Sequence, residues 1–263
     1  MNAVKNALRT IITFRWNPNK DLAAVLVSWL LVTGALYTAT VIVTPELGGG
    51  MAYFALYGIV AAALFGVGIP LAWTVAVRKR PIQDLGITTR LLGVSIVLQL
   101  VFAGLQYMGT LAKTQLPAMS SLLPLVGLAL AIAFFEAVFW RGWVLLRLEE
   151  AVGLIPAVLL GSALYAVYHV GYGMPFSEIA FLFLIGVMYA VTFRITRSVF
   201  LLWPNFQPMG QLVTLVKDQL SLPAIAALGF LEVFVLMALL VWLANRYHKK
   251  QHARLVKTHS TAD

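Results

Sequence analysis

The chain contains eight long apolar runs, separated by short polar or charged segments. They cover residues 22–43, 51–77, 91–111, 122–146, 153–170, 179–195, 199–216 and 222–245. Most are near or above the about 20 residues that an α-helix needs to cross about 30 Å of hydrocarbon. Strands of a membrane β-barrel would be about half as long and would alternate in polarity, which these runs do not. The runs predict an all-α fold, a polytopic transmembrane helix bundle of about eight spans.

Composition excludes the main alternatives to a membrane protein. Hydrophobic residues make up 61% of the chain and charged residues only 11%, against about 25% charged residues in soluble domains. A chain of this composition cannot cover a soluble globular enzyme with a polar surface. Because the chain has no cysteine, it can form no disulfide, thiolate metal site or catalytic thiol.

The basic residues predict the orientation of the bundle. If the amino terminus is cytoplasmic, seventeen of the nineteen lysines and arginines fall in or next to cytoplasmic segments, and only Lys113 and Lys217 lie opposite. This asymmetry is a strong positive-inside signal and predicts that both termini are cytoplasmic. The net charge of +9 is therefore interpreted as topology and lipid contact, with no nucleic-acid partner. We expect an integral protein of the bacterial cytoplasmic membrane.

The sequence divides into three parts. Residues 1–21 form a basic, amphipathic segment that either lies along the membrane surface or is a frayed terminus. Residues 22–246 form the transmembrane domain, and residues 247–263 form a basic tail without regular structure. The seventh run is the weakest because it contains Pro204, Asn205, Gln207 and Pro208, which favour a broken or re-entrant helix.

Four ionisable residues lie inside the apolar runs: Glu136, Arg141, His169 and Glu232. Each costs about 2.5–3.5 kcal/mol on insertion scales, so each is a candidate functional residue. The fourth and fifth runs predict a helical hairpin with its turn near residues 148–156. Glu136 and His169 each lie about 16 residues from the middle of that turn, or about 25 Å along their helices. We expect the two side chains at equal depth, although equal depth does not make them face each other.

A carboxylate and an imidazole at one depth can hold a water molecule between them, with the carboxylate accepting its proton. An equally acceptable interpretation is a buried pair of Glu136 with Arg141 or His169 that only fixes helix register. Zinc would have to rely on Glu136, His169 and Glu232, an unusual ligand set, so no metal or other cofactor is expected. For Glu232 we favour a structural role, as the partner of Arg141 or of a polar group on the seventh run; the alternative is a second catalytic acid or a member of a proton relay.

Two motifs resemble those of the CPBP family, which comprises CAAX prenyl proteases and bacteriocin-processing membrane proteases and is also called the Abi family. The stretch from Glu136 to Arg141 resembles the family's Glu-Glu-x-x-x-Arg motif, with Ala137 in place of the second glutamate. The stretch from Tyr165 to His169 resembles its Phe-x-x-x-His motif, with tyrosine in place of phenylalanine. The segment that starts at Arg80 resembles a loop often found before the first motif.

The family's third motif has no histidine in this chain, and Asn205 or Gln207 is expected there as a neutral hydrogen-bond donor to an oxyanion. The resemblance implies an eight-helix intramembrane protease in which Glu136 is the general base, His169 its partner and Arg141 a supporting charge. Its partners would be a peptide or membrane-protein substrate and the lipid bilayer. The alternatives are a catalytically inactive relative that binds or scaffolds a membrane partner, and a proton-linked transporter.

Overall fold

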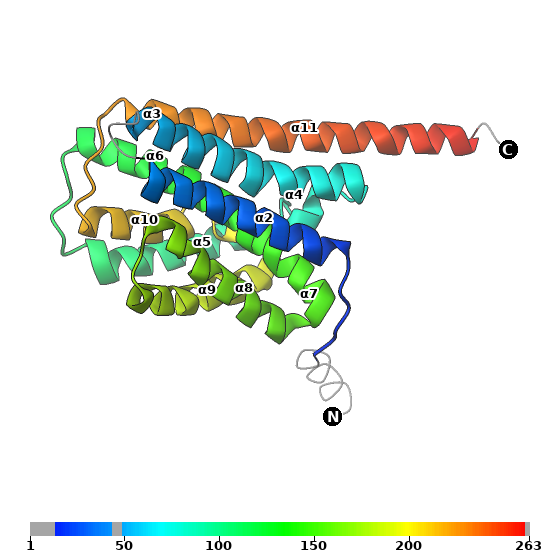
Figure 1. The fold of residues 1–263 in the computed structure, drawn as a ribbon, viewed down its shortest axis with the longest axis horizontal. Coiled ribbons are helices and arrows are strands. Elements are labelled where there is room, and N and C mark those ends of the chain that lie inside the picture. The colour runs from blue at the N-terminus through cyan, green and yellow to red at the C-terminus, as the bar shows by residue number, and fades with distance from the viewer. Residues whose placement is uncertain (1–13, 44–48, 261–263) are drawn as a thin grey trace.

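The computed structural model describes residues 14–43 and 49–260, and the regular structure in these ranges is entirely helical (Figure 1). Seven helices within these ranges are long and apolar enough to cross a membrane. They cover Lys20–Ile42, Gly50–Val77, Leu92–Leu111, Met119–Val152, Leu154–Tyr172, Phe176–Thr196 and Ala226–Ala253. This confirms the predicted class, an all-α polytopic bundle that is an integral part of a membrane.

Several spans join α-helical to π-helical or 3-10 segments. In chain order the elements are α2 Lys20–Tyr37, η1 Thr38–Ile42, α3 Gly49–Phe54, η3 Ala55–Gly68, α4 Ile69–Ala72, η4 Trp73–Val77, η5 Ile82–Leu85, α5 Leu92–Gln106, η6 Tyr107–Leu111, α6 Met119–Glu136, η7 Ala137–Leu145, α7 Leu146–Val152, α8 Leu154–Tyr168, η8 His169–Tyr172, α9 Phe176–Thr196, η9 Val199–Leu201, α10 Phe206–Lys217 and α11 Ala226–Ser260. The span α6–η7–α7 is the most deeply buried of the seven.

The seventh apolar run takes the broken form that its prolines and amides favour, so the described chain has seven span-length helices rather than eight. It consists of the short η9, a turn and the 12-residue α10. Pro208 lies in the first turn of α10, where its missing N–H costs no helical hydrogen bond. Although broken, the run leads back across the bundle, so the start of α2 and the carboxyl end of α11 lie at the same end (Figure 1).

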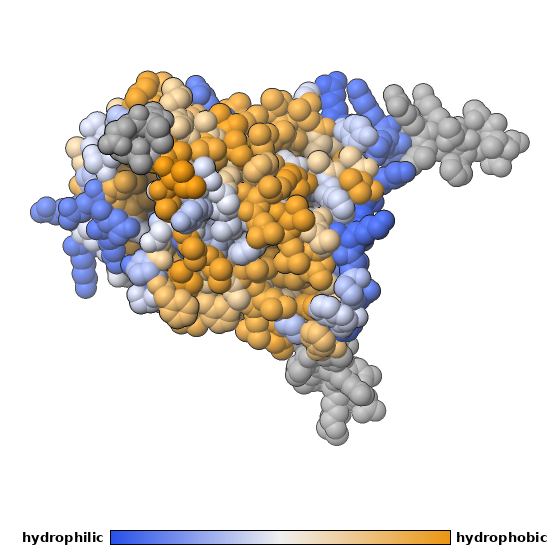
Figure 2. All heavy atoms as spheres, in the orientation of Figure 1, coloured by the Kyte–Doolittle hydropathy of each residue, from blue (hydrophilic) through white to orange (hydrophobic). Residues whose placement is uncertain are grey.

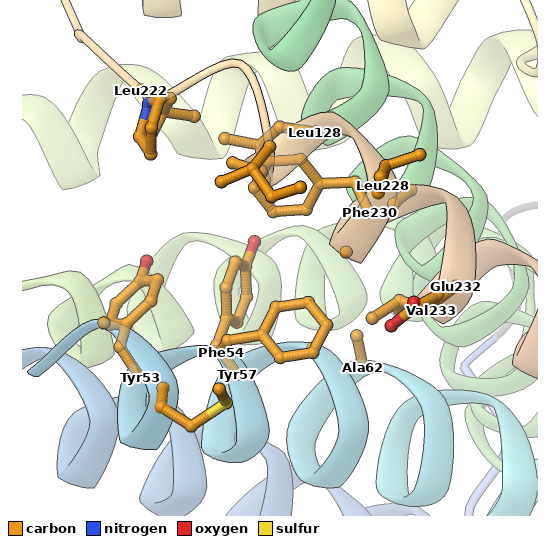
Figure 3. A pocket seen from close by; sticks show the side chains of 18 of the residues that line it. Tyr53, Phe54, Tyr57, Ala62, Leu128, Leu222, Leu228, Phe230, Glu232 and Val233 are labelled. Carbon is orange, nitrogen blue, oxygen red and sulfur yellow. The ribbon is translucent and has the colours of Figure 1, made fainter. Parts of the chain in front are cut away.

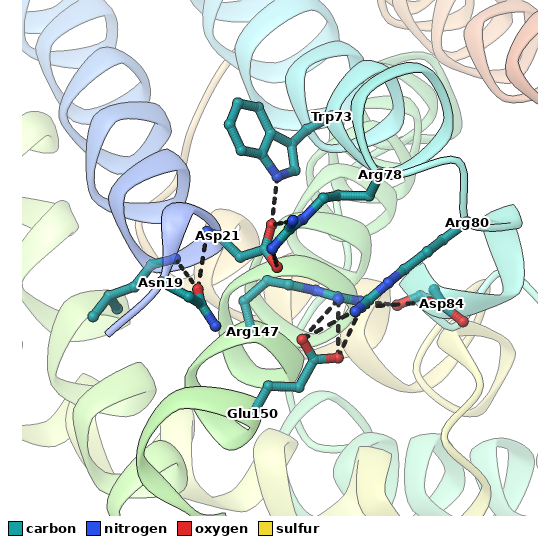
Figure 4. Close-up of polar contacts among 9 residues, drawn as sticks. Asn19, Asp21, Trp73, Arg78, Arg80, Asp84, Arg147 and Glu150 are labelled. Atoms are coloured by element: carbon teal, nitrogen blue, oxygen red, sulfur yellow. Dashed lines mark hydrogen bonds and ion pairs between the residues drawn. The ribbon is translucent and has the colours of Figure 1, made fainter. Parts of the chain in front are cut away.

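That shared end of the bundle is polar and basic, and an apolar band covers the middle of the face in Figure 2. Asn19 caps α2 by accepting hydrogen bonds from the backbone N–H groups of Asp21 and Leu22. The Asp21 carboxylate accepts from Arg78 at 2.7 and 2.6 Å and from Trp73 at 2.6 Å (Figure 4), and its hydrogen bonds raise the pKa of Arg78. The compartment that this end faces stays a prediction.

Both predicted terminal segments are partly described. Residues 1–13 of the predicted surface segment lie outside the described residues, while the backbone of Arg15 and Asn17 donates to the carbonyls of Val152 and Ala151. At the other end α11 continues as a helix to Ser260, where the sequence predicts a tail without regular structure. The reason is local: residues 246–260 include lysine, arginine, alanine, leucine and glutamine and contain no glycine or proline, so nothing ends the helix.

The predicted hairpin is formed by α6–η7–α7 and α8, and its turn is at Gly153. This glycine has φ of 93°, in the region that favours residues without a Cβ. A second glycine, Gly142, lies against the backbone of Leu85, where an added Cβ would overlap the carbonyl oxygen. The loop before α5 is thereby held tightly against the span that carries Glu136.

Candidate active site

Glu136 is the last residue of α6 and is buried to 1% exposure. Its Oε1 accepts a hydrogen bond from the Tyr168 hydroxyl at 2.5 Å. Its Oε2 accepts from Nε2 of Gln207 at 2.7 Å and from Nε2 of Gln211 at 3.1 Å. A carboxylate offers about four acceptor positions, so three donors compensate for its burial and one position on Oε1 is left for a further proton donor, such as water.

Local structure brings these donors to the carboxylate. Tyr168 is the last residue of α8, the partner of α6–η7–α7 in the hairpin. Gln207 and Gln211 are four residues apart on α10, so they lie on one face of that helix. Immediately after Glu136 the span changes from α-helix to the π-helical η7, a deviation often found at functional sites. The broken seventh run therefore supplies the amides that a straight lipid-facing helix would not place here.

His169 follows Tyr168 at the end of α8 and is 5% exposed. Its Nδ1 lies 2.8 Å from the backbone carbonyl oxygen of Tyr165. A carbonyl oxygen only accepts, so Nδ1 carries the proton of this hydrogen bond, and Nε2 of the neutral ring is left as an acceptor. The imidazole is thus held in one tautomer with its basic nitrogen directed away from α8.

Glu136 and His169 meet around Tyr168 rather than in a direct pair. The Tyr168 ring lies 4.4 Å from the His169 ring, between centroids, while its hydroxyl binds Glu136. Among the described residues no hydrogen bond joins the carboxylate to the imidazole. Tyr168 therefore links the two residues, which come from the two arms of one hairpin, and their shared water stays a prediction.

Arg141 pairs with neither of the two carboxylates, Glu136 and Glu232, that the sequence suggested as its partners. Arg141 is 1% exposed, and its guanidinium lies over the rings of Tyr165 and Tyr189, at 4.9 and 5.9 Å from their centroids. Within the described ranges it forms no ion pair. Glu232 is exposed on α11, beside a different cavity. The expected pairing of Glu232 with Arg141 is wrong, because Glu232 lies exposed on α11 while Arg141 is buried against tyrosine rings. Among the described residues Glu232 also forms no hydrogen bond with the seventh run.

Of the two amides expected near the site, only Gln207 reaches it. Asn205 precedes α10, and its backbone N–H donates to Oε1 of Gln99 at 3.0 Å. Tyr168 and Gln211, both bonded to Glu136, are absent from the predicted site residues. A signal for Tyr168 was present: residues 165, 168, 169 and 172 are Tyr, Tyr, His and Tyr, a spacing that puts four polar aromatic rings on one helical face.

A cavity of about 430 Å³ adjoins this cluster. Its inner wall includes His169, Tyr165, Tyr189 and Gln211. Gln211 both lines the cavity and donates to Glu136, so it separates the carboxylate from the open space. The outer wall is formed by residues of α5–η6, α9 and α10, and it includes Phe181, which is 62% exposed. Glu178 in the first turn of α9 and Lys217 at the end of α10 also line it, so its exposed lining is both apolar and charged.

A second cavity of about 520 Å³ lies between η3, α6 and α11 and is almost entirely apolar (Figure 3). Tyr57 and Glu232 are among its few polar lining residues. The Tyr57 hydroxyl lies 3.0 Å from that of Tyr172, which lies 3.4 Å from that of Tyr168. A row of hydroxyl groups thus leads from this cavity to Glu136.

The part of the chain that the structure describes contains no group of three or more histidine, cysteine, aspartate or glutamate residues able to hold a metal ion. The side chains gathered at the site are a buried carboxylate, an imidazole, two side-chain amides, a guanidinium and several phenols.

One comparison with known proteins gives a match. The family model "Type II CAAX prenyl endopeptidase Rce1-like" matches residues 117–204. This range contains Glu136, Arg141, Tyr168 and His169 and ends before α10, which carries Gln207 and Gln211. No curated protein and no solved structure matches the chain.

Proposed function

We propose that the chain is an intramembrane endopeptidase, because a family model of type II CAAX prenyl endopeptidases (Rce1-like) matches its residues 117–204. The observation that carries this proposal is the buried Glu136 carboxylate, held by three donors next to a cavity that contains His169. Substrates of such an enzyme are peptides or membrane proteins. The exposed lining of the cavity, with Phe181 beside Glu178 and Lys217, suits a peptide that approaches at the edge of the bilayer.

In the proposed reaction Glu136 acts as the general base. A water molecule donates a hydrogen bond to the free acceptor position of Oε1, and Nε2 of His169 orients it. The water oxygen bonds to the peptide carbonyl carbon as its proton moves to Glu136. The proton then passes to the departing amine nitrogen as the C–N bond breaks, which returns the carboxylate to its initial state.

The side-chain amides complete the proposed site. Charge develops on the carbonyl oxygen as water attacks, and preorganised donors stabilise such an oxyanion. Gln207 and Gln211 are the amides placed beside the carboxylate, so they take the role that the sequence assigned to Asn205 or Gln207. Arg141 contributes positive charge from its position over Tyr165 and Tyr189.

Replacing Glu136 by glutamine tests the proposal, because Glu136→Gln removes the base with little change in volume. We expect cleavage of reconstituted prenylated and unprenylated CAAX peptides, followed by mass spectrometry, to fall by about 100-fold or more. The matched control is Glu232→Gln, which removes the exposed carboxylate of α11. Undiminished cleavage by a folded Glu136→Gln protein would exclude the general-base role.

A non-catalytic membrane-partner protein is the second candidate. It is favoured by the closed environment of Glu136, which does not itself line the cavity, and by Ala137 in place of a second glutamate. For such a protein, Glu136→Gln would leave the cellular phenotype intact. Neither the unaltered protein nor the Glu136→Gln variant would form a peptide product.

A further inference from the structure

A separate cavity of about 540 Å³ lies at the basic end of the bundle. It is formed by the 83–91 loop, the start of α5, the region of α7 and the end of α9. Four arginines line it, Arg90, Arg147, Arg194 and Arg197, against two carboxylates, Asp84 and Glu150. The cavity wall therefore has an excess of positive charge.

Arg147 gives the cavity a fixed inner wall. Its side chain is only 3% exposed. Its Nη1 donates to Glu150 at 2.9 Å and its Nη2 to the Asp84 carbonyl oxygen at 2.9 Å. Figure 4 shows Arg147 between Asp84 and Glu150. Nε of Arg147 has no hydrogen-bond partner among the described residues, so a buried guanidinium at this cavity is incompletely satisfied.

The carboxylates near the cavity are already engaged. Glu150 also pairs with Arg80 at 3.1 Å, and Glu149 pairs with Arg194 at 3.1 Å. Within residues 14–43 and 49–260, no carboxylate lies at ion-pair distance from Arg90 or Arg197. In addition, α5 begins at this cavity after Leu91, without a side-chain cap. The N-terminal end of a helix favours an anion because of the helix dipole. The dipole of α5 and the unpaired arginines therefore both favour the binding of an anion in this cavity.

The same cavity has an apolar side at the ends of two span-length helices, where α5 begins and α9 ends. Leu91 and Ile195 line it and are 50% and 54% exposed. A free phosphate would gain nothing from these residues, whereas a phospholipid has hydrocarbon chains next to its phosphate. We propose that this cavity binds the headgroup phosphate of an anionic membrane phospholipid, with Arg90 and Arg197 as the charges that select it. The proposal does not depend on proteolytic activity.

The test uses the full chain purified in detergent and in nanodiscs. Retention of phosphatidylglycerol against phosphatidylcholine is measured by native mass spectrometry, and soluble dihexanoyl phosphatidylglycerol and inorganic phosphate are titrated separately. We expect preferential binding of phosphatidylglycerol and no binding of inorganic phosphate at equal concentration. The double variant Arg90→Gln with Arg197→Gln should weaken phosphatidylglycerol binding on the order of 30-fold, because it removes two arginines from the cavity that binds the phosphate and each should account for roughly fivefold.

The matched control is Lys249→Gln with Lys250→Gln, which removes two exposed charges of α11 outside the cavity. This control should stay within about twofold of the unaltered protein, since it does not touch the cavity. Equal losses in both double variants would show unspecific surface attraction and overturn the proposal. Binding of inorganic phosphate as tightly as the lipid would assign a soluble anion instead. Elution profile and melting temperature confirm that each variant is folded.

Discussion

At the scale of single residues, Glu136 illustrates how a membrane bundle accommodates a buried carboxylate. Its donors are a phenol and two amides, and the nearby Arg141 is directed toward tyrosine rings. These neutral donors form hydrogen bonds with the carboxylate oxygens, and the carboxylate forms no ion pair among the described residues. A carboxylate held in this way remains available to accept a proton.

Replacing Tyr168 by phenylalanine should weaken both the site and the fold. The variant Tyr168→Phe keeps the ring but removes the donor to Oε1, which leaves that oxygen without its protein partner. We expect the free energy of unfolding to fall by about 1–3 kcal/mol and the turnover number for peptide cleavage to fall more than KM rises. Thermal melting in detergent and steady-state kinetics measure the two effects.

The matched control for this substitution is Tyr107→Phe, which removes the hydroxyl of a tyrosine that is 43% exposed. Tyr107→Phe should change neither the free energy of unfolding nor the turnover number measurably. If Tyr168→Phe behaves as Tyr107→Phe does, the hydrogen bond to Glu136 contributes to neither stability nor turnover.

At the scale of elements, the contact between the 83–91 loop and η7 depends on Gly142. In Gly142→Ala the new Cβ would meet the Leu85 backbone, and backbone cannot move aside as a flexible side chain can. We expect a loss of about 1–3 kcal/mol in stability, measured as a lower melting temperature. The loop also carries Asp84 and Arg90, so the cavity at the basic end should be disturbed too.

Gly93→Ala is the control for this prediction, because no atom lies within 4 Å of the position a Cβ would take there. Alanine is favoured over glycine inside a helix by about 0.5–1 kcal/mol, so Gly93→Ala should be neutral or slightly stabilising. A Gly142→Ala protein as stable as Gly93→Ala would contradict the close contact seen in the structure.

The hairpin and α10 differ in how far the sequence could predict them. Two antiparallel helices joined by a turn near Gly153 predict about equal depths for Glu136 and His169, if both arms have the rise per residue of an α-helix. Rotation about each helix axis is set by packing and by the π-helical η7, so the position of Tyr168 between them could not be read from spacing. Similarly, the prolines of the seventh run predicted a break but not which amide would face Glu136.

At the scale of the whole molecule, the described chain forms one bundle (Figure 1). Its first span begins, and its last span ends, at the same basic end of that bundle. Reporter fusions at the two termini should therefore give signals from the same compartment, and the positive-inside rule predicts the cytoplasm. The measurement is a paired alkaline phosphatase and fluorescent protein assay. Signals from opposite sides of the membrane would contradict the conclusion that the seventh run, residues 199–216, leads back across the bundle.

The sequence by itself determined the class of this protein, its basic end and the residues that carry ionisable groups in the membrane. Those features follow from the cost of placing polar groups in hydrocarbon, which acts on each segment separately. Only the tertiary structure decided that Tyr168, Gln207 and Gln211 hold Glu136, that Arg141 lies on tyrosines and that Glu232 lies elsewhere. These contacts join segments far apart in the chain, and they depend on helix rotation and side-chain packing, which no local pattern encodes.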